Sequence, residues 1–230
     1  MTGYVSITRH PRPMVMGVII LLLICTCTPV CTFCLLGTKS HTHRRHYLTS
    51  KEATTLTDIQ IRDSLYGELK DAVEVIIESF YADAKPPWNH MYRLAELNRL
   101  QQGFPYADRD MHRMLVAVAR DVEQGRDRIV GFCDCDLRIP NQNTSYKFNP
   151  RPYISDLCVS PSIRRQGIAN RLVEYCEEFC KYSGKDEAYI RVERENVAAV
   201  TLYTNLGYVE FENHLDDSEK IVILRKSLRF

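Results

Sequence analysis

Residues 164–169, Arg-Arg-Gln-Gly-Ile-Ala, form a basic, glycine-containing segment directly before a helical pattern. The first N–H groups of a helix have no acceptor within the helix, and the helix dipole favours negative charge there. Gly167 lets the backbone approach a ligand closely, Arg164 and Arg165 add positive charge, and the small side chain of Ala169 leaves room. The segment is a candidate pyrophosphate site, although a single glycine before a helix often only shapes a turn.

The elements around this segment give it a context. Residues 153–159 read as a strand, and residues 168–182 carry apolar positions at helical spacing. Residues 188–192 read as a further strand. Asn196 is placed to cap a helix that ends at Leu206 before Gly207. The candidate anion site therefore lies between a strand and a helix, with a second helix one strand later.

The rest of the chain predicts a single mixed α/β domain over residues 58–230, with a mixed central sheet flanked by helices. Helices are expected at residues 69–81 and 88–102. Strands are expected at residues 59–62, 114–120, 128–138, 209–211 and 220–228.

These motifs together resemble the GNAT superfamily of N-acetyltransferases. The resemblance in fold order covers Asp58 to Phe230, and its specific motifs lie between Tyr153 and Tyr208. It implies acetyl-CoA as co-substrate and transfer of its acetyl group to an amine. The resemblance assigns contacts with the pantetheine arm to backbone groups of Leu157, Cys158 and Val159. It assigns contacts with the pyrophosphate to the basic loop, which consists of Arg164, Arg165, Gln166, Gly167, Ile168 and Ala169. It also places Asn196 beside the cofactor.

The resemblance also implies two catalytic tyrosines. Tyr203 matches a tyrosine near the thioester sulfur, where an acid can protonate the departing thiolate. Tyr153 stands where histone-type members carry Glu and one class of protein N-terminal acetyltransferases carries Tyr, and it is the expected base, acting through an ordered water. Glu193 and Asp156 are alternative bases, with Asp156 expected on the opposite face of the strand from Tyr153. Arg191, on the expected strand 188–192, differs from the Glu or His that several N-terminal acetyltransferases have at the matching position.

Three kinds of function stay open at this point. The segments YISDLCV and RRQGIA resemble plastid and N-terminal acetyltransferases more than antibiotic-modifying members, which favours a protein α-amino group or a lysine as acceptor. A small-molecule amine is the alternative acceptor. A membrane-anchored acyl-CoA-binding module without catalysis is the alternative outside enzymes.

Charge and cysteine usage exclude other partners. The formal net charge is +1, so no global field attracts nucleic acid. Cys133, Cys135, Cys158, Cys176 and Cys180 contain no Cys-x-x-Cys pair, so no metal site is expected, and they read as buried free thiols of a reducing compartment.

The first 50 residues differ from the rest, because they contain five basic residues and no acidic one. Residues 1–32 read as a signal peptide or signal anchor, and the apolar stretch 14–36 is long enough to contact or span a membrane. Residues 33–57 read as a transit-like segment or a disordered linker. Together these segments resemble the bipartite leaders of complex plastids, and a membrane anchor in the secretory pathway is the alternative.

Overall fold

The computed structural model describes residues 56–121, 125–138, 151–211 and 220–229. The expected signal segment 1–32, the apolar stretch 14–36 and the expected linker up to residue 55 lie outside these ranges. The first strand begins at Leu56, two residues before the boundary expected from the sequence.

Within the described residues, no helix is both long enough and apolar enough to cross a bilayer.

In the described residues, seven strands and four α-helices follow one another in the order expected from the sequence. They are β1 (Leu56–Asp63), a short 3₁₀ turn η1 (Tyr66–Glu68), α2 (Leu69–Phe80), α3 (Trp88–Gly103), β2 (His112–Asp121), β3 (Arg126–Asp136), β4 (Tyr153–Val159), a second 3₁₀ turn η2 (Pro161–Ile163), α4 (Ile168–Tyr182), β5 (Glu187–Glu193), α5 (Val197–Asn205), β6 (Val209–Glu210) and β7 (Ile221–Ser227).

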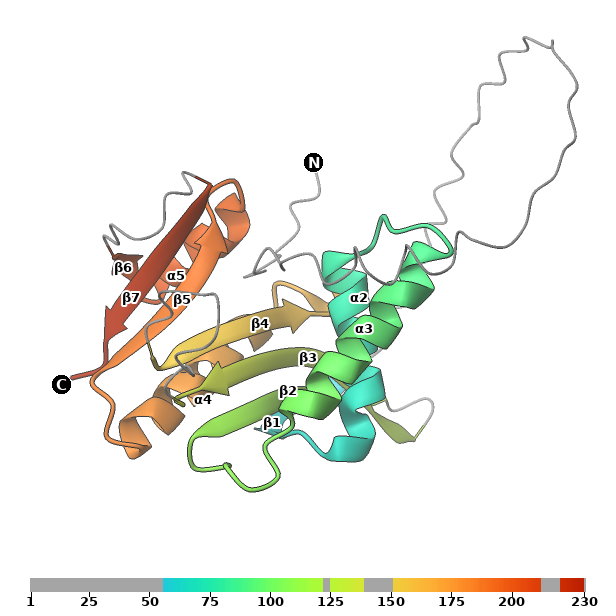
Figure 1. Ribbon diagram of the computed structural model, residues 1–230, viewed down its shortest axis with the longest axis horizontal. Helices are drawn as coiled ribbons and strands as arrows, with labels where there is room; N and C mark the ends of the chain where they lie inside the picture. Colours follow the sequence, from blue (N-terminus) through green and yellow to red (C-terminus); the bar gives the residue numbers. More distant parts are fainter. Residues whose placement is uncertain (1–55, 122–124, 139–150, 212–219, 230) are drawn as a thin grey trace, which may run out of the picture. The chain divides into compact units, whose positions relative to one another are not determined.

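The strands form one sheet in the order β1-β2-β3-β4-β5-β7-β6 (Figure 1). All neighbouring strands are antiparallel except β4 and β5, which are parallel. The predicted mixed sheet flanked by helices is therefore confirmed. The parallel pair is formed because α4 carries the chain back across the sheet from the end of β4 to the start of β5.

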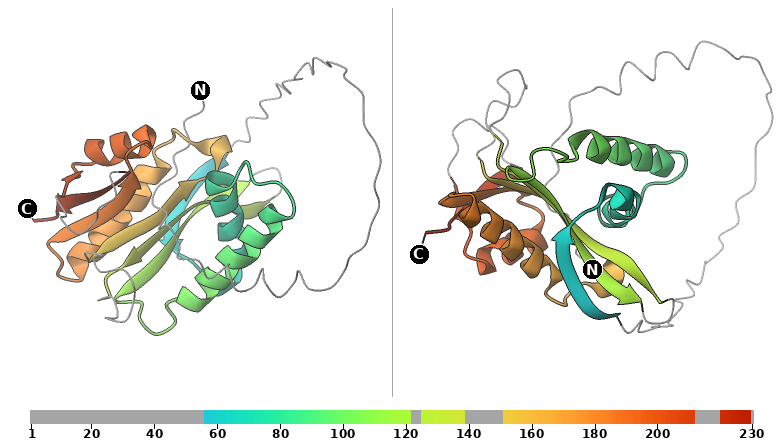
Figure 2. Two further views of the ribbon diagram at one scale, coloured as in Figure 1. Left: turned by 45° about the horizontal axis from the view of Figure 1, so that its top comes forward. Right: turned by 90° about the horizontal axis from the view of Figure 1, so that it is seen from below.

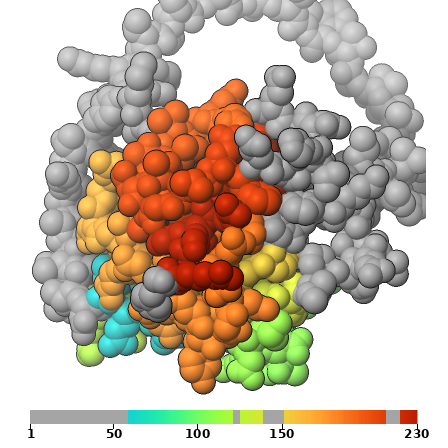
Figure 3. All heavy atoms as spheres, turned by 90° about the vertical axis from the view of Figure 1, so that its left-hand side faces the viewer, coloured from blue at the N-terminus to red at the C-terminus, as the bar shows by residue number. Residues whose placement is uncertain are grey.

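Figure 2 shows helices on both faces of this sheet, and a hydrophobic core lies on each face. Along β2, Leu115 and Ala117 belong to the core that α4 and α5 cover, whereas Met114 and Val116 belong to the core that α2 covers. This division follows from the alternation of side chains along a strand. On the side seen in Figure 3, the surface is formed mainly by the elements from α4 onward.

The two helices on the α2 face differ in how they pack. α2 buries an apolar stripe that includes Leu69, Val73 and Ile76, and each such side chain contributes roughly 1.5–3 kcal/mol when fully buried. In α3, only Glu96 and Leu100 are buried, and Leu94 is 54% exposed. α3 is thus held by a few contacts, one of which involves a buried carboxylate.

Candidate active site

The parallel strands β4 and β5 separate soon after they meet. Each has seven residues, but among the described residues their ladder contains only the pairs Tyr153↔Tyr189 and Ile154↔Ile190. Beyond Ile154, the side of β4 that faces β5 therefore lacks its sheet partner. Backbone groups of Leu157, Cys158 or Val159 on this side can bind an extended ligand as a neighbouring strand would.

A bulge in β4 accompanies this separation. On one side of it Cys158 pairs with Phe132, and on the other Ser155 pairs with Asp134, so that two residues of β4 oppose one of β3. The extra residue of a bulge is left out of the ladder, and its N–H group can point elsewhere. Asp156, inside the bulge, has a φ of +53°, which is uncommon for a residue with a side chain.

The bulge changes the face on which Asp156 lies. Ile154 and Leu157 both pack into the core on the α4 side, although strict alternation would put residues three apart on opposite faces. Asp156 instead contacts Arg99 of α3 at 2.8 Å, on the other side of the sheet. Tyr153 precedes Ile154 and points to that same side. The expectation that Asp156 and Tyr153 lie on opposite faces was therefore wrong.

The start of α4 is open to a ligand. Its N-cap is Gly167, whose φ of +77° suits glycine, and no side chain caps the first turn. A Cβ atom added to Gly167 would meet no other atom within 4 Å. Arg165 also has a positive φ, of 69°, and Arg165, Gln166 and Gly167 are exposed, so this loop can present several N–H groups to an anion. Ile168 is buried and anchors the helix, and Ala169 is half-buried.

Arg164 has a different environment from Arg165. Its Nε atom donates to the carbonyl oxygen of Val159 at 3.0 Å, and a terminal nitrogen donates to Ser79 Oγ of α2 at 3.4 Å. The side chain thus connects the loop to the end of β4 and to α2. The sequence alone suggested only a positive charge close to the phosphates.

The hydroxyl of Tyr203 is placed by α5. Asn196 caps this helix by accepting a hydrogen bond from the N–H of Ala199 at 3.2 Å. Tyr203 is 0% exposed, and its hydroxyl has no hydrogen-bond partner among the residues that the structure describes. Burial raises its pKa well above the ordinary value, with further contributions from Cys133 and Tyr153. A buried hydroxyl of this kind can donate a hydrogen bond to a ligand that reaches it.

Tyr153 lies at the point where β4 and β5 separate. It is 5% exposed, and the guanidinium group of Arg151 lies 5.3 Å from the centre of its ring. Burial raises its pKa above the ordinary value, and the charge of Arg191 acts in the opposite direction. The phenol is therefore protonated at neutral pH. Of the other residues considered, Arg191 is buried on β5 and Glu193 is exposed at the end of this strand.

A charged network on the α2 and α3 side was not predicted from the sequence. The hydroxyl of Tyr81 donates to Glu96 Oε1 at 2.7 Å, and Arg99 Nε donates to Glu96 Oε2 at 2.9 Å. Arg99 also reaches Asp156 in the bulge. A sequence signal did exist, because Glu96 lies four residues before the buried Leu100, on the inner side of the helix.

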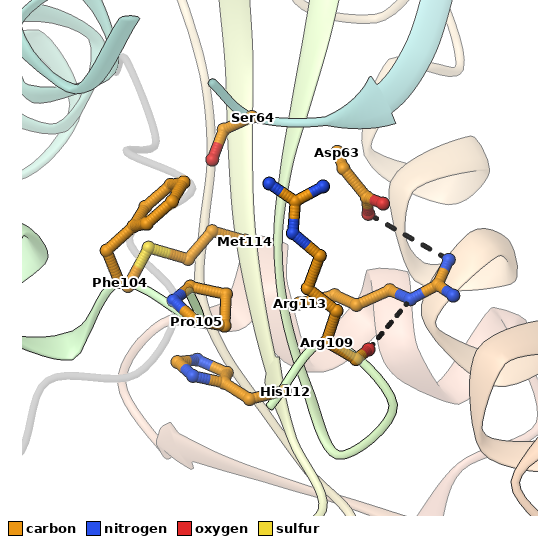
Figure 4. A pocket seen from close by; sticks show the side chains of 8 residues that line it. All are labelled: Asp63, Ser64, Phe104, Pro105, Arg109, His112, Arg113 and Met114. Atoms are coloured by element: carbon orange, nitrogen blue, oxygen red, sulfur yellow. Dashed lines mark hydrogen bonds and ion pairs between the residues drawn. The ribbon is translucent and has the colours of Figure 1, made fainter. Parts of the chain in front are cut away.

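His112 and Asp134 form a second pair on this side of the sheet, with 2.6 Å between His112 Nε2 and Asp134 Oδ1. Beyond His112 there is a cavity of about 10 Å³, close to the size that holds one water molecule. Figure 4 shows its lining, where Arg113 lies between the carboxylate of Asp63 and the carbonyl of Arg109. None of its lining residues belongs to β4, β5 or α5. The cavity is thus separate from the anion site at α4.

The five cysteines of the domain are buried and free, as expected from the sequence. The sulfur atoms of Cys133 and Cys176 are 3.7 Å apart, and those of Cys135 and Cys180 are 3.9 Å apart. These contacts join β3 to α4. In the part of the chain that the structure describes, no group of three or more His, Cys, Asp or Glu side chains is arranged to hold a metal ion.

Comparison with solved structures supports the same architecture. The PaiA N-acetyltransferase from Thermoplasma acidophilum, solved in complex with coenzyme A, superposes with a TM-score of 0.53 at 18% identity. The match covers 74% of this chain and 99% of that one. At this identity the similarity establishes the fold.

Sequence comparison gives relatives of higher identity that match over part of the chain. GCN5-related N-acetyltransferase 6, chloroplastic, from Arabidopsis thaliana is 35% identical over 83 residues, which are 34% of this chain and 28% of that protein. N-alpha-acetyltransferase 30 from Saccharomyces cerevisiae is 31% identical over 99 residues, 43% of this chain and 53% of that protein. The chain thus spans about half or less of the length of these relatives.

The profile of the acetyltransferase (GNAT) family matches residues 75–208, more than half of the 230 residues. The matched range contains the β4 bulge, the open start of α4 and Tyr203. On the family match and the shared fold together, this chain belongs to the acetyltransferase (GNAT) family.

Proposed function

We propose that this protein transfers an acetyl group from acetyl-CoA to a primary amine of a protein, an N-terminal α-amino group or a lysine. The observation that carries the proposal is the buried hydroxyl of Tyr203, which has no hydrogen-bond partner among the described residues. Tyr203 lies on the helix that follows β5, the strand that separates from β4, and a catalytic acid there requires a hydroxyl that can donate to the leaving sulfur.

The residues of the site fit acetyl-CoA. The uncapped first turn of α4, after Arg165, Gln166 and Gly167, would hold the pyrophosphate. The unpaired side of β4 from Leu157 to Val159 would hold the pantetheine arm through backbone groups. The carbonyl oxygen of Val159 already accepts a hydrogen bond from Arg164. Val159 would therefore bind the pantetheine arm through its N–H group. Asn196 keeps the start of α5 in place beside this strand.

Acetyl-CoA supplies an activated thioester. Around it, the chain has three tasks. Backbone N–H groups at the β4 bulge stabilise negative charge on the carbonyl oxygen. The hydroxyl of Tyr203 gives a proton to the departing sulfur. Tyr153, protonated at neutral pH, holds an ordered water, and the proton that the attacking amine loses passes through this water to the solvent. A phenolate at Tyr153 is disfavoured by its burial.

A protein amine is the favoured acceptor for two reasons. One relative is named for α-amino acetylation, and Tyr153 occupies the position where one class of N-terminal acetyltransferases carries the same residue. Arg191 differs from the Glu or His that several of those enzymes have on β5. The way in which this chain activates the amine therefore differs from theirs.

The test is turnover of acetyl-CoA with a panel of acceptors. The panel contains peptides with free α-amino groups, peptides with blocked N-termini and one lysine, and a polyamine. Preference for the first or second group supports a protein acceptor, and preference for the polyamine would replace it with a small-molecule acceptor. Binding of acetyl-CoA without turnover on any amine would mean a binding module instead of an enzyme.

We propose further that the protein acts in a plastid. The basic, acid-free composition of residues 1–50 and a relative named as chloroplastic support this location. Residues 1–57 fused to a fluorescent reporter test it, since plastid signal is expected. Signal in the secretory membranes would favour the anchor, and diffuse cytosolic signal would contradict both.

A further inference from the structure

Three polar contacts form a continuous path from the helical layer to the β4 bulge. Tyr81, at the end of α2, holds one carboxylate oxygen of Glu96, and Arg99 holds the other. Arg99 then reaches Asp156 Oδ2 at 2.8 Å. The side chain of Glu96 is 5% exposed and that of Asp156 is 15% exposed, whereas that of Arg99 is 32% exposed, so the two carboxylates lie largely out of solvent. Contacts between charges in such surroundings fix geometry more strongly than surface pairs do.

The path ends at a residue with an unfavourable backbone conformation. A positive φ is unfavourable at a residue with a side chain and persists only where the surroundings hold it. Asp156 has this conformation at the place where β4 leaves its regular ladder with β3. Its side chain is held by Arg99, which comes from a different layer of the protein.

The charge of Asp156 depends on the same partner. Burial raises the pKa of Asp156, and the neighbouring Asp134 and Glu96 raise it further, whereas Arg99 lowers it. Without Arg99 the carboxyl group would be buried beside two other carboxylates, and protonation would be favoured. The ion pair and the bulge conformation would then be lost together.

We propose that Arg99 is a positioning residue for acetyl transfer, which holds Asp156 so that the N–H groups of the β4 bulge keep their orientation toward the thioester carbonyl. The inference rests on the proposed function and adds to it a residue on α3 that need not touch either substrate. A displacement of about 1 Å at reacting groups can cost on the order of 10²-fold in rate. Loss of Arg99 should therefore act on the chemical step.

Four variants test the proposal. In Arg99→Met and Asp156→Asn, kcat should fall about tenfold to a hundredfold, while the KM for acetyl-CoA stays within about twofold of the wild-type value. The double variant should lose no more than either single one, because both remove the same contact. Arg99→Lys keeps the charge but cannot bind Glu96 and Asp156 with one planar group, and should recover part of the rate.

Arg93 provides the matched control. It lies on the same helix and forms an ion pair with Glu74 of α2 at 2.8 Å, far along the helix from the bulge. Arg93→Met should leave kcat and KM unchanged. If Arg99→Met behaves as Arg93→Met does, or if the effects of Arg99→Met and Asp156→Asn multiply in the double variant, the positioning role is refuted.

A readout without turnover separates this inference from the proposed function. Hydrogen exchange of the amides of residues 154–158 should be faster in Arg99→Met than in wild type, and unchanged in Arg93→Met. If wild type acetylates no amine, the proposed function fails, and the exchange rates alone decide whether Arg99 holds the bulge. Equal exchange in wild type and Arg99→Met would overturn the inference even for an active enzyme.

Discussion

Arg164 Nε lies 3.0 Å from the carbonyl oxygen of Val159, so the loop before α4 is tied to the last residue of β4. Two parts of the proposed cofactor site, the strand for the pantetheine arm and the loop for the pyrophosphate, are thereby joined. Because the Arg164 side chain already binds protein atoms, we expect the direct partners of a phosphate to be the amides around Gly167. A change at Gly167 is therefore the direct test of the proposed pyrophosphate site.

The first prediction concerns Gly167→Asp. The added carboxylate would lie at the open start of α4, where phosphates are expected, and its φ of +77° is unfavourable for any side chain. Affinity for acetyl-CoA, measured by calorimetry, should fall roughly tenfold or more. Gly184→Asp is the control, since Gly184 has a φ of +71°, equal free space and a place beyond the other end of α4. Unchanged affinity in a folded Gly167→Asp protein would remove the pyrophosphate assignment.

The second prediction concerns Tyr203→Phe. This change keeps the ring, including its edge contact with Tyr208, and removes a hydroxyl that has no partner among the described residues. The turnover number should fall about 10²–10⁴-fold, with little change in acetyl-CoA affinity.

Stability distinguishes the two roles of Tyr203. Removing an unpartnered buried hydroxyl should leave the melting temperature equal or higher. Tyr208→Phe, at a residue that is also buried, should keep the wild-type rate. A Tyr203→Phe protein that turns over at the wild-type rate would mean that Tyr203 only packs.

The third prediction concerns pH and His112. Burial lowers the pKa of His112, but the adjacent Asp134 raises it by more, so its pKa in the folded protein lies above the ordinary value of 6.5. The native state then holds this proton more tightly than the unfolded state does. The pair should stabilise the fold fully below the ordinary pKa, and this stabilisation should be lost as the pH rises through the folded pKa.

His112→Gln tests this dependence, because it removes the charge and keeps a donor. Urea unfolding of both proteins should show a larger difference in free energy of unfolding at pH 5.5 than at pH 8.5. An equal difference at the two pH values would mean that folding does not shift the pKa of His112.

The fourth prediction concerns the residues before β1. A chain that begins at Ser50 should fold and keep full activity, because the first element of the domain begins at Leu56. A chain that begins at Asp63 should be destabilised by roughly 2 kcal/mol or more, since it lacks the β1 ladder and the packing of Ile59 and Ile61. Thermal unfolding measures both. Loss of activity in the chain from Ser50 would show that the leader belongs to the catalytic unit.

The sequence by itself determined the elements and the family. The bounds of β4 and α4 agree with the predicted residues 153–159 and 168–182, because alternation and helical spacing are local properties of the chain. The exposed glycine before α4 and the Asn196 cap could be found for the same reason. Each depends on residues within one turn of its own helix.

The tertiary structure alone decided which side chains meet. Arg164 binds Ser79, 85 residues away, and Arg99 binds Asp156 across two layers. The face of Asp156 was mispredicted because a bulge depends on the register with β3, and a register is set by pairing between strands. Contacts of this kind arise from the packing of α2 and α3 on the sheet, which no local pattern encodes.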